Sequence, residues 1–371
     1  MKFSCPQQVL SKALNTVSKA VSVRTTIPVL KGILIKADSE GYVTFSASDL
    51  DISIEKKINA NVIVPGEIVV YAKLFTDIIR KLSSEEILIE LVDETINIKS
   101  SYSEFNLVGI PTDEFPNIVD IKEIKSNLSF DKEIFKDMIK KTYFSASIDE
   151  SKGVLVGVLL EMEKKNFNMV AIDGFRMAVC RETMTNAEED NLIISAKTLG
   201  EVYKILSESD SIEDINIVIG DKKVVLNIDN TKIVARTIEG DFIKYKDILP
   251  KENNTSIIIN RNTFINGIER ASLLAKEGKN NLIKCTIEEN LLNISSRSEE
   301  GSVKEDIIIE KTGDNIEIGF NSKYLLDALK AIENEEIVLE FGTSTSPCLI
   351  KPIEGNEFVY LVLPVRITSN Y

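Results

Sequence analysis

The chain contains one helical pattern three times, and this repetition constrains its fold more than any other feature. Residues 195–206 read SAKTLGEVYKIL, residues 71–82 read YAKLFTDIIRKL and residues 321–332 read NSKYLLDALKAI. Counted from the lysine of each copy (Lys73, Lys197, Lys323), apolar residues fall two, five, six and nine positions on, an acid four on and a base seven on. At about 100° per residue, the apolar positions form one stripe and the charged positions the opposite face. The pattern predicts three amphipathic helices in a threefold internal repeat.

The remainder of each copy follows a common order. A further helix is predicted at 5–21, 131–141 and 261–276, with Asp131 and Asn260 as N-caps of the later two. Strand-like runs follow at 32–37 and 42–58, at 154–162 and 169–181, and at 282–287 and 291–309. More strands are predicted after the repeated helix, beginning at 86–91, 214–219 and 336–341. The prediction is an α+β protein of three tandem domains, 1–121, 128–247 and 256–371, joined by polar linkers near 117–127 and 247–255.

Composition restricts the class of protein. Hydrophobic residues make up 43% and charged residues 27% of the chain, as in ordinary globular proteins. No apolar run reaches the roughly 18 residues of a membrane span. The N-terminal sequence MKFSCPQQVLSKAL lacks the apolar core of a signal peptide, so a cytoplasmic location is expected. The four scattered cysteines (Cys5, Cys180, Cys285, Cys348) indicate neither a disulfide framework nor a zinc site.

An enzymatic function is disfavoured. The chain has no histidine, which removes the commonest general base and the commonest metal ligand. Asp49, Asp51, Asp149 and Asp173 could be imagined as metal-binding carboxylates, but no phosphate-loop, zinc-protease, hydrolase or calcium-loop motif is present. Asp49 and Asp173 occupy the same place in two repeats, which fits turn residues better than catalysis. We therefore expect neither catalysis nor a cofactor or metal.

The distribution of charge points to a polyanion. The formal net charge is −14, yet each of the six predicted helices carries a net positive charge. Basic helices on an acidic body favour binding of a polyanion to one face. The alternative is that these helices are solvated faces crossed by ion pairs between neighbouring turns. The occurrence of the pattern in all three repeats favours the functional interpretation.

Helix dimensions limit how such repeats could surround a duplex. Helices that pack side by side lie about 8–10 Å apart and are about 10 Å thick. A circle of six would leave an opening of only about 8 Å, whereas a circle of twelve would leave about 26 Å. Duplex DNA, about 20 Å across, fits only the larger circle. One chain cannot therefore encircle DNA, but two chains arranged head to tail can.

Several motifs in order resemble one family across essentially the whole chain. They are the MKF start, Arg24 before IPVLKGILI (27–35), SASDLDISI (46–54), IPTDEFPNI (110–118), AIDGFRMAV (171–179) and LVLPVRI (361–367). Together, on a triplicated chain, they resemble the bacterial DNA polymerase III beta subunits, the sliding clamps. The resemblance implies a homodimeric ring with helices lining the channel and sheets outside, which holds double-stranded DNA without base readout and tethers polymerases without catalysing a reaction.

The resemblance and the charge pattern together select candidate DNA contacts. Arg24 matches an arginine of the family that faces the channel, and the other candidates are bases of the predicted helices. The DNA-binding candidates are Arg24, Lys12, Lys73, Arg80, Lys197, Lys204 and Lys323. Because topology would hold the ring on DNA, weak phosphate contacts would suffice.

A partner-binding groove is the second candidate site. The second repeat has Gly174-Phe175-Arg176-Met177 where the other repeats are more polar, and we expect an exposed aromatic and an exposed methionine there. In the family this segment and the C-terminal tail bind short peptides of polymerases, the clamp loader and repair proteins. The resemblance implies this lining: Leu155, Ile172, Gly174, Phe175, Arg176, Met177, Ile243, Ile248, Leu361, Val362, Leu363, Pro364, Val365 and Arg366. For Ile172 and Leu361, an ordinary core position is the competing interpretation. Phe175 and Met177 stand where the family commonly has histidine and leucine, so the resemblance implies the site but does not define its peptide preference.

The dimer interface would join the first repeat of one chain to the third repeat of the other. The resemblance places apolar contacts at Phe105 and Leu107 on an edge strand and at Leu273 and Leu274 on a helix. Pairing of edge strands would protect their free backbone groups. The competing function is a monomeric, non-catalytic scaffold that binds peptides and does not encircle DNA.

Overall fold

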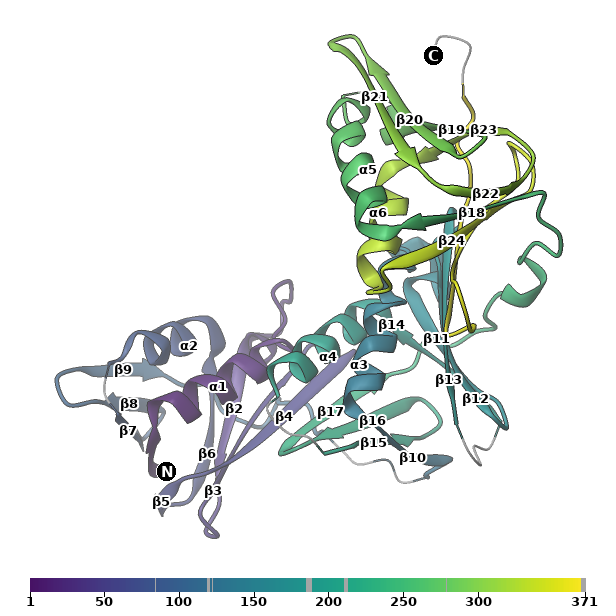
Figure 1. Cartoon of the computed structure of the whole chain (residues 1–371). Coiled ribbons are helices and arrows are strands. Elements are labelled where there is room, and N and C mark those ends of the chain that lie inside the picture. Colours follow the sequence, from purple (N-terminus) through teal and green to yellow (C-terminus); the bar gives the residue numbers. More distant parts are fainter. Residues whose placement is uncertain are drawn as a thin grey trace. The chain divides into compact units, whose positions relative to one another are not determined.

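The computed structural model describes residues 1–83, 85–118, 121, 123–184, 189–209, 213–277 and 279–367 (Figure 1). It divides into two compact units. The first comprises Met1–Phe135 and Glu201–Thr237, and the second comprises Lys136–Gly200 and Ile238–Tyr371. Among the described residues, no helix has the length and hydrophobicity needed to cross a membrane.

The α-helices of the described chain lie where the repeat predicts them. They are α1 (Gln7–Ser18), α2 (Ala72–Lys81), α3 (Lys132–Lys140), α4 (Ala196–Glu208), α5 (Arg261–Ala275) and α6 (Ser322–Ala331). In α2, α4 and α6 the predicted apolar stripe is confirmed, because its first residues, Phe75, Leu199 and Leu325, two positions after the lysine, are all buried. The lysine that begins each pattern is exposed. Three short 3-10 helices lie at Pro28–Lys31, Tyr143–Ser145 and Lys279–Asn281, and two more at Glu150–Val156 and Tyr245–Asp247.

The predicted N-caps are present. The Asn260 side chain accepts a hydrogen bond from the backbone N–H of Thr263 at 3.0 Å, and Asp131 accepts one from Ile134 at 2.9 Å. Such bonds satisfy backbone donors that have no partner inside the helix. The first helix begins later than predicted, because residues 2–6 form the strand β1 (Lys2–Pro6), which pairs with β5 (Asn61–Val64) on one side and with β7 (Glu86–Val92) on the other.

The first unit contains a 5-stranded and an 8-stranded antiparallel sheet. The smaller sheet has the order β5 (Asn61–Val64), β1 (Lys2–Pro6), β7 (Glu86–Val92), β8 (Thr95–Lys99) and β9 (Glu104–Val108). The larger has the order β10 (Ser126–Phe130), β15 (Ile215–Ile219), β16 (Lys223–Ile228), β17 (Thr231–Arg236), β4 (Ile52–Asn59), β3 (Tyr42–Ser48), β2 (Gly32–Ala37) and β6 (Gly66–Tyr71). The helices α1 and α2 pack against each other, and α1 also packs on β3 and β4.

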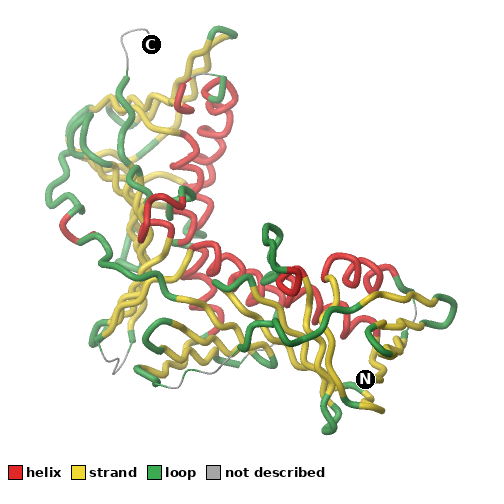
Figure 2. The backbone as a smooth tube through the Cα atoms, turned by 180° about the vertical axis from the view of Figure 1, so that it is seen from behind, coloured by secondary structure: helices red, strands yellow, loops and turns green. Residues whose placement is uncertain are grey.

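The second unit is built in the same way, with a 9-stranded and a 4-stranded sheet. The larger has the order β14 (Asp190–Ser195), β11 (Gly157–Met162), β12 (Asn166–Ile172), β13 (Arg176–Thr183), β26 (Phe358–Val362), β25 (Cys348–Pro352), β24 (Glu336–Phe341), β18 (Thr255–Asn260) and β22 (Glu310–Gly313). The smaller has the order β21 (Gly301–Ile308), β20 (Leu291–Ser298), β19 (Leu282–Glu288) and β23 (Ile316–Asn321). Within this unit α5 and α6 pack against each other, and the strands lie to one side of them (Figure 1 and Figure 2).

The large sheets join one repeat to the next. The last strand of the second repeat, β17, pairs with β4 of the first repeat, and β26 of the third repeat pairs with β13 of the second. In both sheets the strand pair across the junction is antiparallel and fully hydrogen-bonded over several residues. The repeats therefore share continuous sheets, which periodicity within one repeat cannot predict.

Three long strand predictions are corrected to hairpins. The run 42–58 divides into β3 and β4, the run 169–181 divides between β12 and β13, and the run 291–309 divides into β20 and β21. The Asp49 carboxylate accepts the N–H of Asp51 at 3.1 Å and that of Ile52 at 2.9 Å, which closes the first turn. Asp173 accepts the N–H of Phe175 at 2.8 Å and that of Arg176 at 3.0 Å in the second. The interpretation of Asp49 and Asp173 as turn residues is confirmed.

Short strands before the helices were not predicted. They are β1, β10 and β18, which precede the first helix of each repeat, and β6, β14 and β23, which precede the second. Two of these, β10 and β18, begin inside or beside the segments expected to be linkers. Each is only five or six residues long, so its alternation is too short to stand out from neighbouring loops.

Candidate functional site

The hairpin between β12 and β13 presents an exposed aromatic ring. Phe175 is 58% exposed, although aromatic side chains of this size are usually mostly buried. Gly174 adopts a φ of +95°, a conformation that favours glycine and allows the tight turn before Phe175. The ring of Phe175 stacks on that of Tyr324 in α6, with centroids 6.0 Å apart and 19° between the planes. The exposed aromatic residue predicted at this site is therefore present, and the Tyr324 ring packs against one face of it.

Arg176 anchors this hairpin to neighbouring elements. Its Nε donates to Asp173 Oδ2 at 2.9 Å, and one terminal nitrogen donates to Asp327 Oδ2 of α6 at 2.6 Å. The other terminal nitrogen donates to the carbonyl oxygen of Phe144 at 2.7 Å. The guanidinium also lies 4.7 Å from the centre of the Tyr324 ring. With a side chain only 10% exposed, Arg176 fixes the position of Phe175 and offers little surface of its own.

An apolar cluster lies under this surface on one face of the large sheet. It contains Leu159, Val170, Ile172, Met177, Val179, Ile193, Tyr245, Leu349, Val359 and Leu361, with Val154, Leu155, Ile238, Phe242 and Leu249 packed at its margin. Of the predicted lining, Ile172 and Leu361 are buried, at 5% and 3% exposure, as their core interpretation predicts. They support the site from beneath rather than forming its surface.

Two predicted lining residues need correction. An exposed methionine was expected at 177, but Met177 is 1% exposed, because alternation along β13 directs its side chain into the apolar cluster. Val362 is also 1% exposed and packs in the separate core of the third repeat, on the opposite face of the sheet from Leu361. Successive strand residues point to opposite faces, so Leu361 and Val362 cannot line the same groove.

Exposed apolar side chains surround the cluster. Ile243 is 41%, Ile248 39% and Leu363 37% exposed, and Leu155 is half-buried. The tail is tied down after β26: the N–H of Leu363 donates to the Phe175 carbonyl at 2.9 Å, and that of Val365 donates to the Gly319 carbonyl at 2.8 Å. Pro364 and Val365 are half-buried and Arg366 is exposed. The arrangement is an apolar surface with a rigid base, open to a ligand.

Several residues of this site were missed by the sequence analysis. Tyr324, Asp327 and Phe144 hold the hairpin, Tyr245 belongs to the buried apolar cluster, and Phe242 and Leu249 pack against that cluster. One signal was available: Tyr324 follows the lysine of the third repeated helix, where the other copies have Leu74 and Thr198. The remaining contacts join segments far apart in the chain and carry no local signal.

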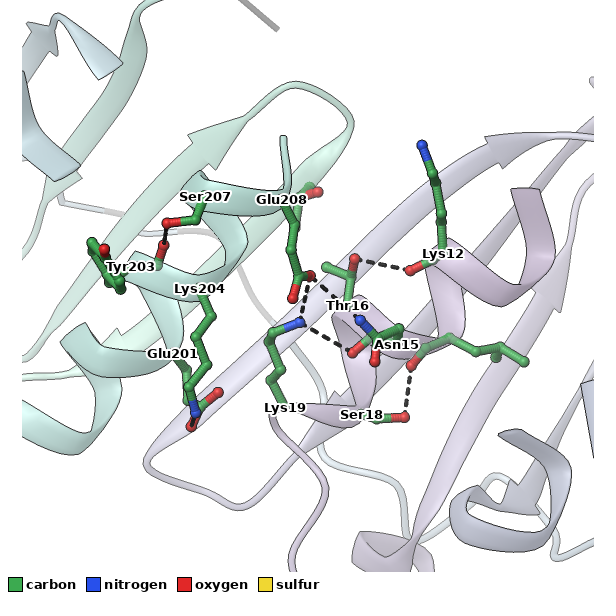
Figure 3. Close-up of polar contacts among 12 residues, drawn as sticks. Lys12, Asn15, Thr16, Ser18, Lys19, Glu201, Tyr203, Lys204, Ser207 and Glu208 are labelled. Carbon is green, nitrogen blue, oxygen red and sulfur yellow. Dashed lines mark hydrogen bonds and ion pairs between the residues drawn. The ribbon is translucent and has the colours of Figure 1, made fainter. Parts of the chain in front are cut away.

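The predicted basic residues lie on exposed helix faces or loops. Lys12, Arg24, Lys73, Arg80, Lys197, Lys204 and Lys323 are all exposed. Arg80 pairs with Asp77 at 2.6 Å. Lys204 pairs with Glu201 at 2.8 Å (Figure 3). Both pairs join the acid and the base of the repeated pattern on one helix. In the third repeat the equivalent acid, Asp327, instead binds Arg176.

Within the first unit, an ion pair ties α1 to the C-terminal end of α4. Lys19 Nζ lies 2.7 Å from Glu208 Oε2, and the Asn15 amide donates to the same oxygen at 3.4 Å (Figure 3). The Lys19 side chain is only 10% exposed, so this lysine forms part of the contact between the first two repeats and is not counted as a DNA-binding candidate. Lys12 lies about two helical turns before Lys19 and projects from the exposed side of α1.

Two of the predicted interface residues lie on an edge strand, and the other two lie on a helix that packs on another edge strand. β9 is the last strand of its sheet, with Phe105 38% and Val108 71% exposed, and Leu107 is half-buried. β21 is the last strand of the 4-stranded sheet, with Ile308 85% exposed. The helix α5 packs on β20 and β21 and carries Leu273, 67% exposed, and the half-buried Leu274. β9 in the first unit and β21 in the second are therefore edge strands with exposed apolar side chains on or beside them.

The geometry describes repeated domains with an exposed apolar surface around Phe175 and with exposed lysine and arginine side chains on the helices. Three family models match successive parts of the chain: DNA polymerase III beta subunit, N-terminal domain (residues 1–119), central domain (129–244) and C-terminal domain (246–366). The Beta sliding clamp of Bacillus subtilis is 36% identical over 99% of this chain and 100% of its own, and that of Staphylococcus epidermidis is 35% identical over 99% of each. The chain belongs to the DNA polymerase III beta subunit family.

Solved structures agree with this assignment. The DNA polymerase sliding clamp from Bacillus subtilis has a TM-score of 0.94 and 35% identity, over 99% of this chain and 100% of that one. The DNA polymerase III beta subunit from Thermotoga maritima has a TM-score of 0.92 and 29% identity at the same coverage. A sliding clamp from Pseudomonas aeruginosa bound to griselimycin has a TM-score of 0.92 and 26% identity. The predicted fold class, an α+β clamp fold of three tandem domains, is confirmed.

Proposed function

We propose that this chain is a DNA sliding clamp, a non-catalytic processivity factor that encircles duplex DNA and tethers a replicative polymerase. The observation that carries the proposal is the repeated helix, whose apolar stripe is buried and whose leading lysine is exposed in every copy. A periodic array of bases suits the phosphate backbone, which has regular charge and no sequence information. Membership of the family supports the same function. Such a protein would act in the cytoplasm, where bacterial DNA is replicated.

The DNA contacts in this proposal are phosphate contacts from exposed bases. We assign them to Arg24, Lys12, Lys73, Arg80, Lys197, Lys204 and Lys323. The acids paired with Arg80 and Lys204 would weaken individual contacts, which suits a protein that must slide. Contacts of this kind should be sensitive to salt and insensitive to base sequence.

The ring in this proposal is a head-to-tail homodimer. β9 of one chain would pair with β21 of the other, and Phe105 and Leu107 would pack against Leu273 and Leu274 of the partner. The pairing would satisfy the free backbone groups at both edges. With two chains, twelve helices are available to line a channel wide enough for a duplex.

The groove in this proposal binds short linear segments of polymerases, of the clamp loader and of repair proteins. Its surface comprises Phe175, Leu155, Ile243, Ile248 and the tail residues Leu363 to Arg366, above the buried Ile172, Met177 and Leu361. Apolar side chains of a partner would be buried against this surface, at about 25 cal/mol per Å² of area removed from water. Gly174 and Arg176 would shape the hairpin that carries Phe175.

Retention on circular DNA tests the ring. The chain is loaded with a clamp loader onto nicked circular DNA, and the complex is isolated by gel filtration before and after the circle is cut. A sliding ring remains on the circle and leaves the linear product through its ends. Equal retention on both forms would refute the ring and favour the monomeric peptide-binding scaffold.

Polymerase stimulation tests the groove. Removal of residues 364–371, of which 368–371 lie outside the described residues, should abolish stimulation of the polymerase and leave the dimer intact. Phe175→Ala should weaken binding of the polymerase in the same way, and the protein should remain a dimer in solution. Unchanged stimulation in both variants would refute this assignment of the groove.

A further inference from the structure

A polar pocket of about 350 Å³ adjoins the groove in the second unit. We call it the acceptor pocket and define it by Glu163, Asn168, Arg181, Tyr245, Lys246 and Glu357. Asn168, Val170 and Ile172 alternate along β12 and therefore point to the same face of the sheet. The last two belong to the apolar cluster under the groove. The acceptor pocket is thus the polar continuation of the groove along the same strands.

Tyr245 belongs to both regions. Its ring is 3% exposed and packs in the apolar cluster, while its hydroxyl donates to Glu161 Oε2 at 2.6 Å beside the pocket. Burial and the neighbouring Glu161 raise the pKa of Tyr245, so the hydroxyl stays protonated and continues to donate. Between Ile172 and Asn168 the strand advances about 13 Å, at about 3.3 Å per residue. An extended partner segment would cover this distance with about four residues.

The pocket contains a buried hydrogen-bond acceptor without a partner. Asn168 is 2% exposed, and its amide nitrogen donates to Glu161 Oε2 at 2.8 Å, but its Oδ1 has no hydrogen-bond partner among the described residues. Buried acceptors are nearly always satisfied, and leaving one unpaired costs free energy. A donor from outside the chain would satisfy this oxygen.

The neighbouring donors are already engaged. Lys246 Nζ lies 2.6 Å from Glu163 Oε1 and 3.3 Å from Glu161 Oε2, and Arg181 donates to the carbonyl oxygen of Asn356 at 3.0 Å. The lining also includes the carboxylates of Glu182 and Glu357, so acids outnumber bases around the pocket. The chemistry therefore favours a ligand that brings donors and positive charge.

We infer that the acceptor pocket receives a lysine or arginine side chain of the partner segment whose apolar residues occupy the groove. This inference rests on the proposed peptide-binding function of the groove and extends it by a second determinant of specificity. The basic residue would lie about three to five residues from the apolar ones, on the side that runs towards Asn168. Its contribution would decrease with salt, because Glu163 and Lys246 are 39% and 54% exposed.

Peptides selected on the chain itself test the inference. Random peptides are selected for binding to the wild-type protein, and one that carries adjacent large apolar residues is synthesised with lysine or norleucine at each position about three to five residues to either side. Norleucine matches the lysine stem and lacks the charge. Affinities are measured by fluorescence anisotropy for the wild type, for Glu163→Gln combined with Glu357→Gln, and for Glu354→Gln. Glu354 lies on the same turn as Glu357 and outside the pocket, so it controls for the loss of one nearby carboxylate charge, whereas the double variant loses two.

One position should favour lysine over norleucine by about fivefold or more in the wild type, as expected for a charge-assisted contact at a partly exposed site. The preference should fall to near unity in the double variant and persist in Glu354→Gln, while the norleucine peptide binds all three alike. A wild type without a lysine preference at any position, or a double variant that keeps it, would overturn the inference. Failure of the groove itself would look different: no apolar peptide would be selected, or Phe175→Ala would bind as well as the wild type.

Discussion

Arg176 and Arg80 offer a matched comparison of buried and exposed ion pairs. In each, a terminal nitrogen of the arginine lies 2.6 Å from an aspartate oxygen, of Asp327 in one case and Asp77 in the other. The Arg176 side chain is 10% exposed and that of Arg80 is 65% exposed. Both pairs join an arginine to an aspartate at the same distance. A difference in the loss of stability between Arg176→Ala and Arg80→Ala therefore reports the burial of Arg176 and its additional hydrogen bonds.

The expected magnitudes follow from the contacts. Arg176→Ala removes the cation paired with Asp173, whose side chain is 12% exposed, and removes the donor to the Phe144 carbonyl. Breaking a buried pair costs about 3–5 kcal/mol, and we expect about 3 kcal/mol because Asp327 remains 31% exposed. For a cooperative unit of about 150–250 residues, this lowers Tm by roughly 6–12 °C. Arg80→Ala removes an exposed pair within one helix and should cost below about 0.5 kcal/mol.

Thermal unfolding followed by circular dichroism, at low and at high salt, measures both variants. Arg176→Lys should recover less than half of the loss, because an ammonium cannot donate in the fork that reaches Asp173 and Asp327 together. Peptide affinity of Arg176→Ala should also fall, because Phe175 loses its anchored hairpin. Equal Tm losses for Arg176→Ala and Arg80→Ala would refute the argument from burial.

Three other measurements test separate features. Leu273→Ala with Leu274→Ala should convert the dimer to monomers in sedimentation, because both side chains would lose apolar contact with the partner; a surviving dimer would refute the proposed interface. Burial raises the pKa of Cys5, Cys180 and Cys285 to about 12, and that of Cys348 also lies well above its usual value, so native protein at about pH 8 should react slowly with a thiol reagent and completely when denatured. Fast labelling of native protein would contradict that burial. The hydrogen bond from Lys246 lowers the pKa of Glu163 below its ordinary 4.5, so this carboxylate stabilises the fold above that pH and the contribution disappears as pH falls through the lowered pKa. The Tm difference between wild type and Glu163→Gln should therefore be present at about pH 7 and vanish in acid, whereas a constant difference would exclude the ion pair as its source.

Helix positions could be read from the chain because their cause is local. Side chains three and four residues apart lie on one helix face, so Phe75 and Ile79, for example, reveal the buried side without knowledge of what covers it. The caps at Asp131 and Asn260 and the turns at Asp49 and Asp173 are also local, because each involves backbone groups two or three residues away. These features were predicted correctly.

Elements defined by distant partners were predicted less well. β1, β10 and β18 are short, and each exists because it pairs with a strand more than 70 residues away, as Phe3 with Ile89 shows. Met177 was expected at the surface because a glycine turn and an aromatic precede it. Its burial depends on β26, which pairs with β13 and completes the cover of the apolar cluster.

By itself, the sequence determined the threefold repeat, the amphipathic helices with their exposed lysines, and the class of protein that such repeats resemble. These properties follow from spacing along a single helix or turn. Only the tertiary structure decided which residues form the surface of the groove, that Arg176 is an internal anchor bound to Asp327 of another repeat, and that a polar pocket continues the groove beyond Tyr245. Those properties arise where strands from different repeats pair in one sheet, and the choice of face and neighbour there depends on strand order and register.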